Sequence, residues 1–345
     1  MKKELITDPS YFPFELSSDR RIGFLKIASD TFKKSSFLDK RIVVPDRQLI
    51  YEDASELEKK LKDLKCSEKK DLIHIFHISH VGSTFISKLL ESINELKVLR
   101  EPNILKNFIR EYYNLSNTSS EYKKNELDSM LHGILNIFLL GRESKVLIKH
   151  MSHNLYLPLR NIHLENISQK EILLYTNLQN FLYHSISSEG LKRDALTNAS
   201  FRLDQLNNLC FSNSFKIDDL EYLEIVSIIW IVEFAKIYYR KLSKENALML
   251  NFDNEFSENK KEETMEKIVK YIFDGDLHNF QTIMSSQYWH INPKNGDEYS
   301  FQARDKAIRS NKFTKITEVE RVCNWVESIC KEEPYLLPLL RYINH

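Results

Sequence analysis

The stretch that most restricts the fold of this chain covers residues 73–102, where an apolar run, a Gly-Ser-Thr turn and a helical pattern follow one another. The run holds Ile73, Ile75, Phe76 and Ile78, and charged residues flank it. Such a run is typical of a strand that is buried on both faces of a parallel sheet. The apolar residues that follow recur at helical spacing: Phe85, Ile86, Leu89, Leu90 and Ile93.

Gly82 lies where this strand gives way to the helix. A chain that turns sharply beside a ligand benefits from a residue without a Cβ atom. The order of strand, turn and helix also directs several backbone N–H groups to one point, where the helix dipole favours an anion. We therefore predict a phosphate or sulfate site at residues 79–85.

The turn departs from the Walker pattern GxxxxGK[ST] of ATPases and GTPases. Gly82 and Thr84 occupy two of its positions, but His77 stands in place of the first Gly and Ser83 in place of the Lys. An ordinary ATPase or GTPase is therefore disfavoured.

Composition is that of a folded chain with a sizeable core, because 42% of the 345 residues are hydrophobic and 28% are charged. Lys plus Arg and Asp plus Glu number 49 each, so no global positive field attracts nucleic acid. No apolar run approaches the length of a membrane span, and residues 1–20 lack the apolar centre of a signal peptide. We predict a cytoplasmic protein without a nucleic-acid partner. Its oligomeric state cannot be read from the sequence.

The remaining patterns predict an α/β fold. Residues 1–68 are expected to form a flanking segment or lid with helical patches at 22–32 and 54–64, and residues 69–345 the main domain. Further strands are predicted at 96–100, 145–149, 171–175 and 247–252, with helices at 220–242 and 265–273 and a surface loop at 114–125. Strands that alternate with helices form a parallel sheet, and ligands bind at the carboxyl ends of its strands.

Residues 79–84, SHVGST, resemble the 5′-phosphosulfate loop of the sulfotransferases, commonly written PKSGTT. The REP tripeptide at 100–102 and the SFLDKR segment at 36–41 are similar to a bacterial branch of this P-loop family, whose loop reads HxGST. The resemblance implies a three-layer α/β/α fold with a helix-rich second half. It also implies transfer of a sulfuryl group from 3′-phosphoadenosine-5′-phosphosulfate (PAPS) to a hydroxyl or amine, without a metal. Small-molecule, carbohydrate and peptide acceptors are all compatible with the sequence.

Within this resemblance, residues 79–85 bind the sulfated end of the co-substrate. The N–H groups of residues 81–85 and the hydroxyls of Ser83 and Thr84 would stabilise charge on the leaving phosphate. His80, which stands where Lys or Arg is usual, would neutralise or protonate it. The loop residues concerned are Ser79, His80, Val81, Gly82, Ser83, Thr84 and Phe85.

Three further residues are candidates for the chemistry. Glu101 follows a predicted strand and is the first candidate for the base that accepts the proton of the acceptor, with His150 as the second. Lys149 ends another strand and is expected to point into the cleft. Pairing of Glu101 with a neighbouring Arg or a helix N-terminus is the structural alternative.

Residues 173–190 resemble the segment that holds the 3′-phosphate, often written RNPxDxxxS. Ser185 matches its serine, but Asn177 stands in place of the arginine, which would grip a phosphate with two hydrogen bonds. Arg193 or Lys192 would have to compensate, and Asn177 equally fits a helix N-cap. The family's carboxy-terminal RKG element is not found, while residues 247–256 resemble its late strand and turn, with Asp253 as a cap or brace.

Two other functions remain open. One is a kinase-like or other nucleotide-dependent transferase on a P-loop scaffold, and the other is a catalytically silent binding protein. A metal site is not predicted, because His74, His77 and His80 lie three residues apart and alternate between the faces of a strand. The four cysteines form no CxxC pair, so free thiols are expected.

Overall fold

The computed structural model describes residues 4–45, 47–54, 56–57, 60, 69–116, 121–159, 164, 166–212, 214–293, 296–298 and 300–344. Its centre is a five-stranded parallel sheet in the order β5-β6-β4-β7-β8. The strands are β4 (Lys70–His77), β5 (Leu96–Arg100), β6 (Lys145–Lys149), β7 (Ile167–Tyr175) and β8 (Leu248–Asn251). The predicted α/β class with a central parallel sheet is confirmed, and every predicted strand is present within a few residues of its expected ends.

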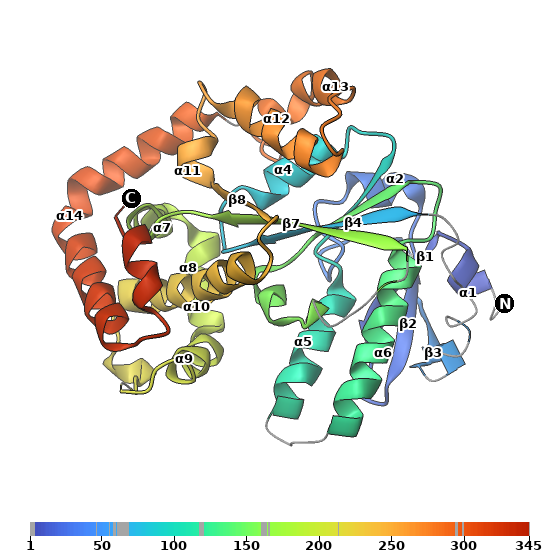
Figure 1. Cartoon of the computed structure of the whole chain (residues 1–345), viewed down its shortest axis with the longest axis horizontal. Coiled ribbons are helices and arrows are strands. Elements are labelled where there is room, and N and C mark those ends of the chain that lie inside the picture. Colours follow the sequence, from blue (N-terminus) through green and yellow to red (C-terminus); the bar gives the residue numbers. More distant parts are fainter. Residues whose placement is uncertain are drawn as a thin grey trace.

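Every residue of β4 is buried, because the strand is central and helices cover both faces of the sheet. Figure 1 shows α4 (Ser83–Leu90) and α12 (Lys261–Ile272) on one face, with α6 (Glu121–Phe138) and α10 (Tyr222–Ser243) on the other. This is a three-layer arrangement, and it explains why apolar residues of β4 occupy positions that face both sides of the sheet.

The second half of the chain is rich in helices, as predicted. The other helices among the described residues are α1 (Glu4–Thr7), α2 (Ser29–Lys34), α5 (Asn103–Ser116), α7 (Leu178–Ser187), α8 (Glu189–Thr197), α9 (Ala199–Asn207), α11 (Phe252–Glu255), α13 (Phe280–Met284) and α14 (Phe301–Glu332), with 3₁₀ turns at Ser152–Tyr156, Ile217–Asp219, Gln287–Trp289 and Leu337–Tyr342. The predicted loop at 114–125 is wrong over most of its length, because α5 continues to Ser116 and α6 begins at Glu121. No described helix is long and apolar enough to cross a membrane.

Helix α10 is the predicted core helix of residues 220–242. A capping box closes its first turn, since Glu221 and Glu224 each accept a hydrogen bond from the other's backbone N–H. Its middle is buried on all sides against α9, α7, α8 and the sheet. Three charged residues, Glu224, Glu233 and Arg240, are buried within this apolar helix.

The N-terminal segment forms a small antiparallel sheet in the order β1-β2-β3. Its strands are β1 (Tyr11–Leu16), β2 (Arg21–Lys26) and β3 (Leu49–Asp53). The helix predicted at 22–32 is therefore wrong: residues 22–25 are buried in succession in the middle strand, and helix begins only at Ser29. Most of the helix predicted at 54–64 lies outside the described residues. The apolar core is continuous between this sheet and the parallel sheet.

Residues 33–41 run beside the carboxyl end of β5. The carbonyl of Arg100 accepts the N–H of Leu38 at 2.6 Å, and the carbonyl of Leu38 accepts the N–H of Asn103 at 3.1 Å. The buried guanidinium of Arg100 donates to the carbonyls of Lys33 and Ser35. The two segments that resemble the sulfotransferase branch outside the loop, 36–41 and 100–102, are thus in direct contact.

Candidate active site

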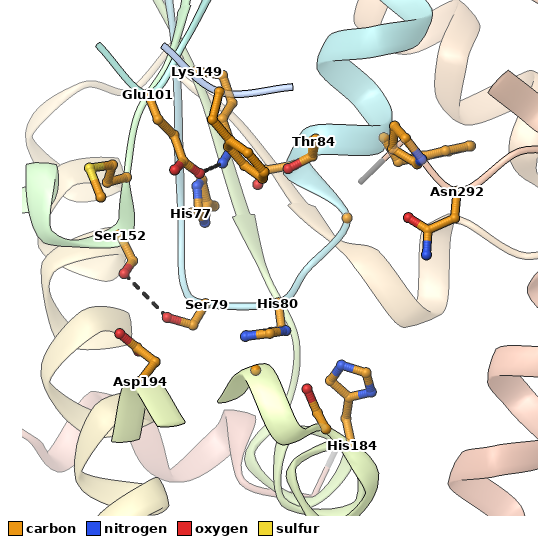
Figure 2. Close-up of a pocket in the computed structure, with 18 of the residues that line it drawn as sticks. His77, Ser79, His80, Thr84, Glu101, Lys149, Ser152, His184, Asp194 and Asn292 are labelled. Carbon is orange, nitrogen blue, oxygen red and sulfur yellow. Dashed lines mark hydrogen bonds and ion pairs between the residues drawn. The ribbon is translucent and has the colours of Figure 1, made fainter. Parts of the chain in front are cut away.

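A cavity of about 910 Å³ opens at the carboxyl ends of the parallel strands (Figure 2). It brings together the loop after β4, the ends of β5 and β6, residues 37–41 of the N-terminal segment, and the wall formed by α7 and α8. The lining residues are Phe37, Asp39, Arg41, His77, Ser79, His80, Gly82, Ser83, Thr84, Phe85, Glu101, Lys149, Met151, Ser152, His184, Ser187, Ser188, Gly190, Asp194, Asn292 and Pro293.

The loop leads directly from β4 into the first turn of α4. In the described part of the chain, the backbone N–H groups of Val81, Gly82, Ser83 and Thr84 have no hydrogen-bond partner. The first N–H groups of a helix lack acceptors within that helix and carry its positive dipole. Three of the four residues line the cavity, whereas Val81 is buried behind it. These amides are therefore available to an anion.

Gly82 occupies the N-cap position of α4 with a left-handed φ of 69°. A Cβ atom at this position would lie 2.0 Å from Cε2 of Phe252, the residue that begins α11. Both the backbone conformation and the close approach require glycine here. The ring of Phe252 supports the loop from the side of β8, where Asp253 accepts a hydrogen bond from Thr176 and braces the ends of two strands.

His80 also has a left-handed backbone, with φ 63°, and its side chain lines the cavity. Figure 2 shows the imidazole turned toward His184 on α7, with the two ring centroids 5.7 Å apart. A Cβ atom on Gly190 would lie 3.6 Å from the His80 ring. The imidazole of His80 therefore lies between the loop and the α7–α8 wall. As a proton donor at this position, it would face a ligand in the cavity.

Glu101 and Lys149 form a buried ion pair on the opposite side of the cavity (Figure 2). The second carboxylate oxygen of Glu101 accepts from Nη2 of Arg41 at 2.5 Å, and Arg41 also pairs with Asp39. The Arg41 guanidinium lies 3.4 Å above the ring of Phe37. Burial alone would raise the pKa of Glu101, but the charges of Lys149 and Arg41 outweigh it and hold that pKa below its usual value.

This pairing predicts an acid-dependent loss of stability. A depressed carboxyl pKa stabilises the fold above the unfolded value of 4.5, and the stabilisation is lost as pH falls below it. We expect Glu101→Gln to cost about 3 kcal/mol of unfolding free energy at neutral pH, because Lys149 is left buried without its counter-charge. The cost should shrink in denaturation experiments at about pH 3.

The matched control is Glu126→Gln, which breaks the half-exposed pair with Arg20 and should cost less than about 1 kcal/mol. An equal cost of Glu101→Gln at both pH values would show that Glu101 is not the ionised partner.

The two histidines at the strand ends are held inside the protein. The ring nitrogens of His77 lie 2.7 Å from the carbonyl oxygens of Ile78 and His150, and burial lowers the pKa of His77 to about 3. His150 is fully buried, with Nε2 2.9 Å from Nδ1 of His74 and its ring stacked on Phe76. Burial also lowers its pKa, and it does not line the cavity, so we do not assign His150 a role as base.

The residues predicted to hold a 3′-phosphate do not line the cavity. Asn177 is the N-cap of α7, where its side-chain oxygen accepts the N–H of Asn180 at 2.7 Å. Ser185 is buried and donates to the carbonyl of Leu182, and Arg193 is exposed on α8. In their place, the α7–α8 wall presents His184, Ser187 and Ser188 to the cavity.

Several residues of the site were missed by the sequence interpretation, notably Arg41, His184, Asp194 and the buried pair of Arg202 and Glu233. Glu233 had a detectable signal, since it is a lone acidic residue in the middle of a strongly apolar helix. Arg41 lies inside the SFLDKR segment, where only tertiary contacts reveal that it reaches Glu101.

The described residues contain no group of three or more His, Cys, Asp or Glu side chains that could hold a metal ion. Cys210, Cys323 and Cys330 are free thiols, while Cys66 lies outside the described part of the chain.

A scan of the sequence against protein-family models finds no match, and a search of curated proteins finds none either. Among solved structures, the chain is similar to a sulfotransferase domain from the curacin biosynthetic pathway. That similarity has a TM-score of 0.35 and 13% sequence identity, and it covers 75% of this chain and 98% of the other. A likeness at this level identifies no family, so the function must rest on the geometry of the site.

Proposed function

We propose that this chain is a sulfotransferase that moves a sulfuryl group from PAPS to a hydroxyl or amine acceptor. The observation that carries the proposal is the set of unpaired N–H groups at residues 81–84, which begin a helix beside a cavity that also holds a buried carboxylate. Such amides bind an oxyanion without reorganisation at the moment of reaction.

In the proposed reaction the bond between sulfur and the bridging oxygen of the 5′-phosphate breaks as the acceptor atom bonds to sulfur. Negative charge grows on the departing phosphate, where the amides of residues 81–84 and the hydroxyls of Ser83 and Thr84 stabilise it. His80 lies on the same loop and would donate a hydrogen bond or a proton to this leaving group.

The acceptor would enter from the side of Glu101 and Lys149. Glu101 is held ionised by its two cationic partners, so its carboxylate is ready to accept the acceptor's proton, although a depressed pKa makes it a weak base. Lys149 and Arg41 keep this carboxylate in place. Phe37 and Met151 add apolar surface to this part of the cavity, which fits a small-molecule, carbohydrate or peptide acceptor.

The 3′-phosphate of PAPS would face the α7–α8 wall. Asn177, Ser185 and Arg193, which the sequence resemblance assigned to this role, lie elsewhere. The groups available at this wall are the imidazole of His184 and the hydroxyls of Ser187 and Ser188. None of these groups has the permanently charged fork of an arginine, which holds a phosphate through two hydrogen bonds, so we expect weaker selectivity for the 3′-phosphate than the resemblance implies.

Binding of adenosine 3′,5′-bisphosphate tests the proposal. At a concentration of 100 times its Kd, the bisphosphate should raise the free energy of unfolding by about 2.7 kcal/mol, measured in thermal-shift titrations. AMP at the same concentration should raise it clearly less, and incubation with PAPS and candidate acceptors should yield sulfated products by mass spectrometry.

The two other functions predict different results in the same titration. Selective stabilisation by magnesium-ATP would favour the kinase-like transferase, because phosphoryl transfer normally uses magnesium to bridge the phosphates. Equal binding of the bisphosphate and AMP, without sulfated product, would favour a silent binding protein.

A further inference from the structure

Glu233 lies directly behind the loop, at the middle of α10. Its Oε2 accepts the backbone N–H of Ser79 at 2.8 Å, and the Ser79 hydroxyl lies 3.2 Å from the same oxygen. Its Oε1 accepts from Nη2 of Arg202 at 2.9 Å. Only 2% of the surface of Glu233 is exposed. The first residue of the loop is thus engaged by the protein itself and not free to bind a ligand through its N–H.

Arg202 extends this contact to the far wall of the cavity. Its guanidinium, also 2% exposed, pairs with Asp194 at 2.7 Å as well as with Glu233. Asp194 lines the cavity on α8, and Asn198 donates to its other oxygen at 2.8 Å. A continuous chain of polar contacts therefore joins Ser79 to the α7–α8 wall through α10 and α9.

A carboxylate at this place has an electrostatic cost. It is desolvated, and burial raises the pKa of Glu233 even though Arg202 opposes the shift. Its negative charge also lies next to a loop that is proposed to bind an anion, where it repels the ligand. An ordinary backbone carbonyl could have accepted the Ser79 N–H without either penalty.

The backbone conformation of the residues after Ser79 suggests a benefit of Glu233 that offsets this electrostatic cost. His80 has a left-handed φ of 63°, and in a residue with a Cβ atom such a conformation persists only where the surrounding structure determines it. Phe252 limits the position of Gly82, and Glu233 limits that of Ser79. The loop is therefore restrained at both of its ends.

We propose that Glu233 is a positioning residue that fixes Ser79 and thereby presets the amides of residues 81–84 for an anion, with Arg202 linking it to Asp194 in the α7–α8 wall. This inference rests on the proposed function only in requiring that the loop binds an anion, whatever group is transferred.

The effect of Glu233→Gln on anion affinity has opposite signs under the two explanations of this residue. If Glu233 acted only through its charge, its neutralisation would remove a repulsion and tighten anion binding. If it positions the loop, the glutamine places an NH2 group, which can only donate, against either the Ser79 N–H or the Arg202 guanidinium, and binding weakens. We expect about tenfold weaker binding of inorganic pyrophosphate, measured by isothermal titration calorimetry on the full chain.

The matched control is Glu171→Gln. Glu171 is also 2% exposed and pairs with an arginine of α10, Arg240, at 2.9 Å, but it does not line the cavity or contact the loop. Glu171→Gln should lower the melting temperature as Glu233→Gln does and leave pyrophosphate affinity unchanged. Equal losses of pyrophosphate affinity in the two variants would show that Glu233 only stabilises the fold, and would overturn the inference.

A second variant covers the case in which Glu233→Gln does not fold. Arg202→Lys keeps the positive charge, but a single ammonium cannot serve Asp194 and Glu233 as the guanidinium does. Pyrophosphate binding should again weaken several-fold, now with no change of net charge. Unchanged or tighter binding in either variant contradicts the positioning role.

The wild-type titrations separate this inference from the proposed function. Pyrophosphate binding without preference for the adenosine bisphosphate over AMP would contradict PAPS as co-substrate and leave Glu233 to be judged by its variants. Absence of pyrophosphate binding by the wild type would overturn the positioning role, because no preset anion site would exist.

Discussion

Gly82→Ala is expected to lower the free energy of unfolding by about 2–5 kcal/mol and to abolish anion binding at the loop. A left-handed φ costs an L-residue about 1–2 kcal/mol, and forcing an extra methyl group into a packed site adds about 1–3 kcal/mol. Both apply here, because φ is 69° and the new Cβ atom would lie 2.0 Å from the Phe252 ring. Urea denaturation measures the loss, and pyrophosphate titration measures the binding.

Gly275→Ala separates the two contributions. Gly275 also has a positive φ, 96°, but nothing lies within 4 Å of its added Cβ atom. Its variant should therefore lose only the backbone part, about 1–2 kcal/mol, and bind pyrophosphate normally. In a Phe252→Leu background the cost of Gly82→Ala should fall, since the smaller side chain leaves room for the methyl group. Equal costs of the two glycine variants would show that the approach of Phe252 is not limiting.

His80→Asn is expected to lower sulfuryl transfer about 100-fold, the scale at which loss of one transition-state donor reduces turnover. Asparagine is among the residues that tolerate a left-handed backbone, so the loop conformation at φ 63° should persist. It cannot, however, carry a proton near neutral pH. Because the donor acts on charge that develops during the reaction, kcat should fall with little change in KM.

The same substitution of a histidine outside the site serves as the matched control. His290 is exposed and does not line the cavity, so His290→Asn should leave turnover unchanged. Steady-state assays on the two variants and the wild type make the comparison, with melting temperatures to check the fold. Wild-type turnover in His80→Asn would exclude this imidazole from the chemistry.

Much of the fold was predictable because it depends on local patterns. The strand at 145–149 has its predicted ends, and the buried run before Gly82 is the central strand, since apolar periodicity reports burial directly. The wrong prediction of a helix at residues 22–32 has the same origin. Residues 22–25 are apolar in succession, and such a short run fits a buried strand as well as a helix. Pairing with β1 and β3 decided between them.

In the candidate site, the residues that directly follow a strand were predictable from the sequence, whereas contacts between segments distant in the sequence were not. The loop and Glu101 were found because each directly follows a strand. Asn177 was assigned two roles, and the structure shows it as an N-cap, since its side chain already bonds Asn180. The contact between Glu233 and the loop could not be predicted, because no local pattern reveals that a residue of a core helix touches a loop 154 positions earlier.

The spacing of neighbouring residues was enough to predict an α/β class with a parallel sheet, the sharp turn at Gly82 and the set of amides that begin α4. The charges that meet around the turn became known from the packing of distant segments: Arg41 and Lys149 on Glu101, and Arg202 on both Glu233 and Asp194. A buried charge is stable only beside a partner, and the position of that partner depends on how these segments pack.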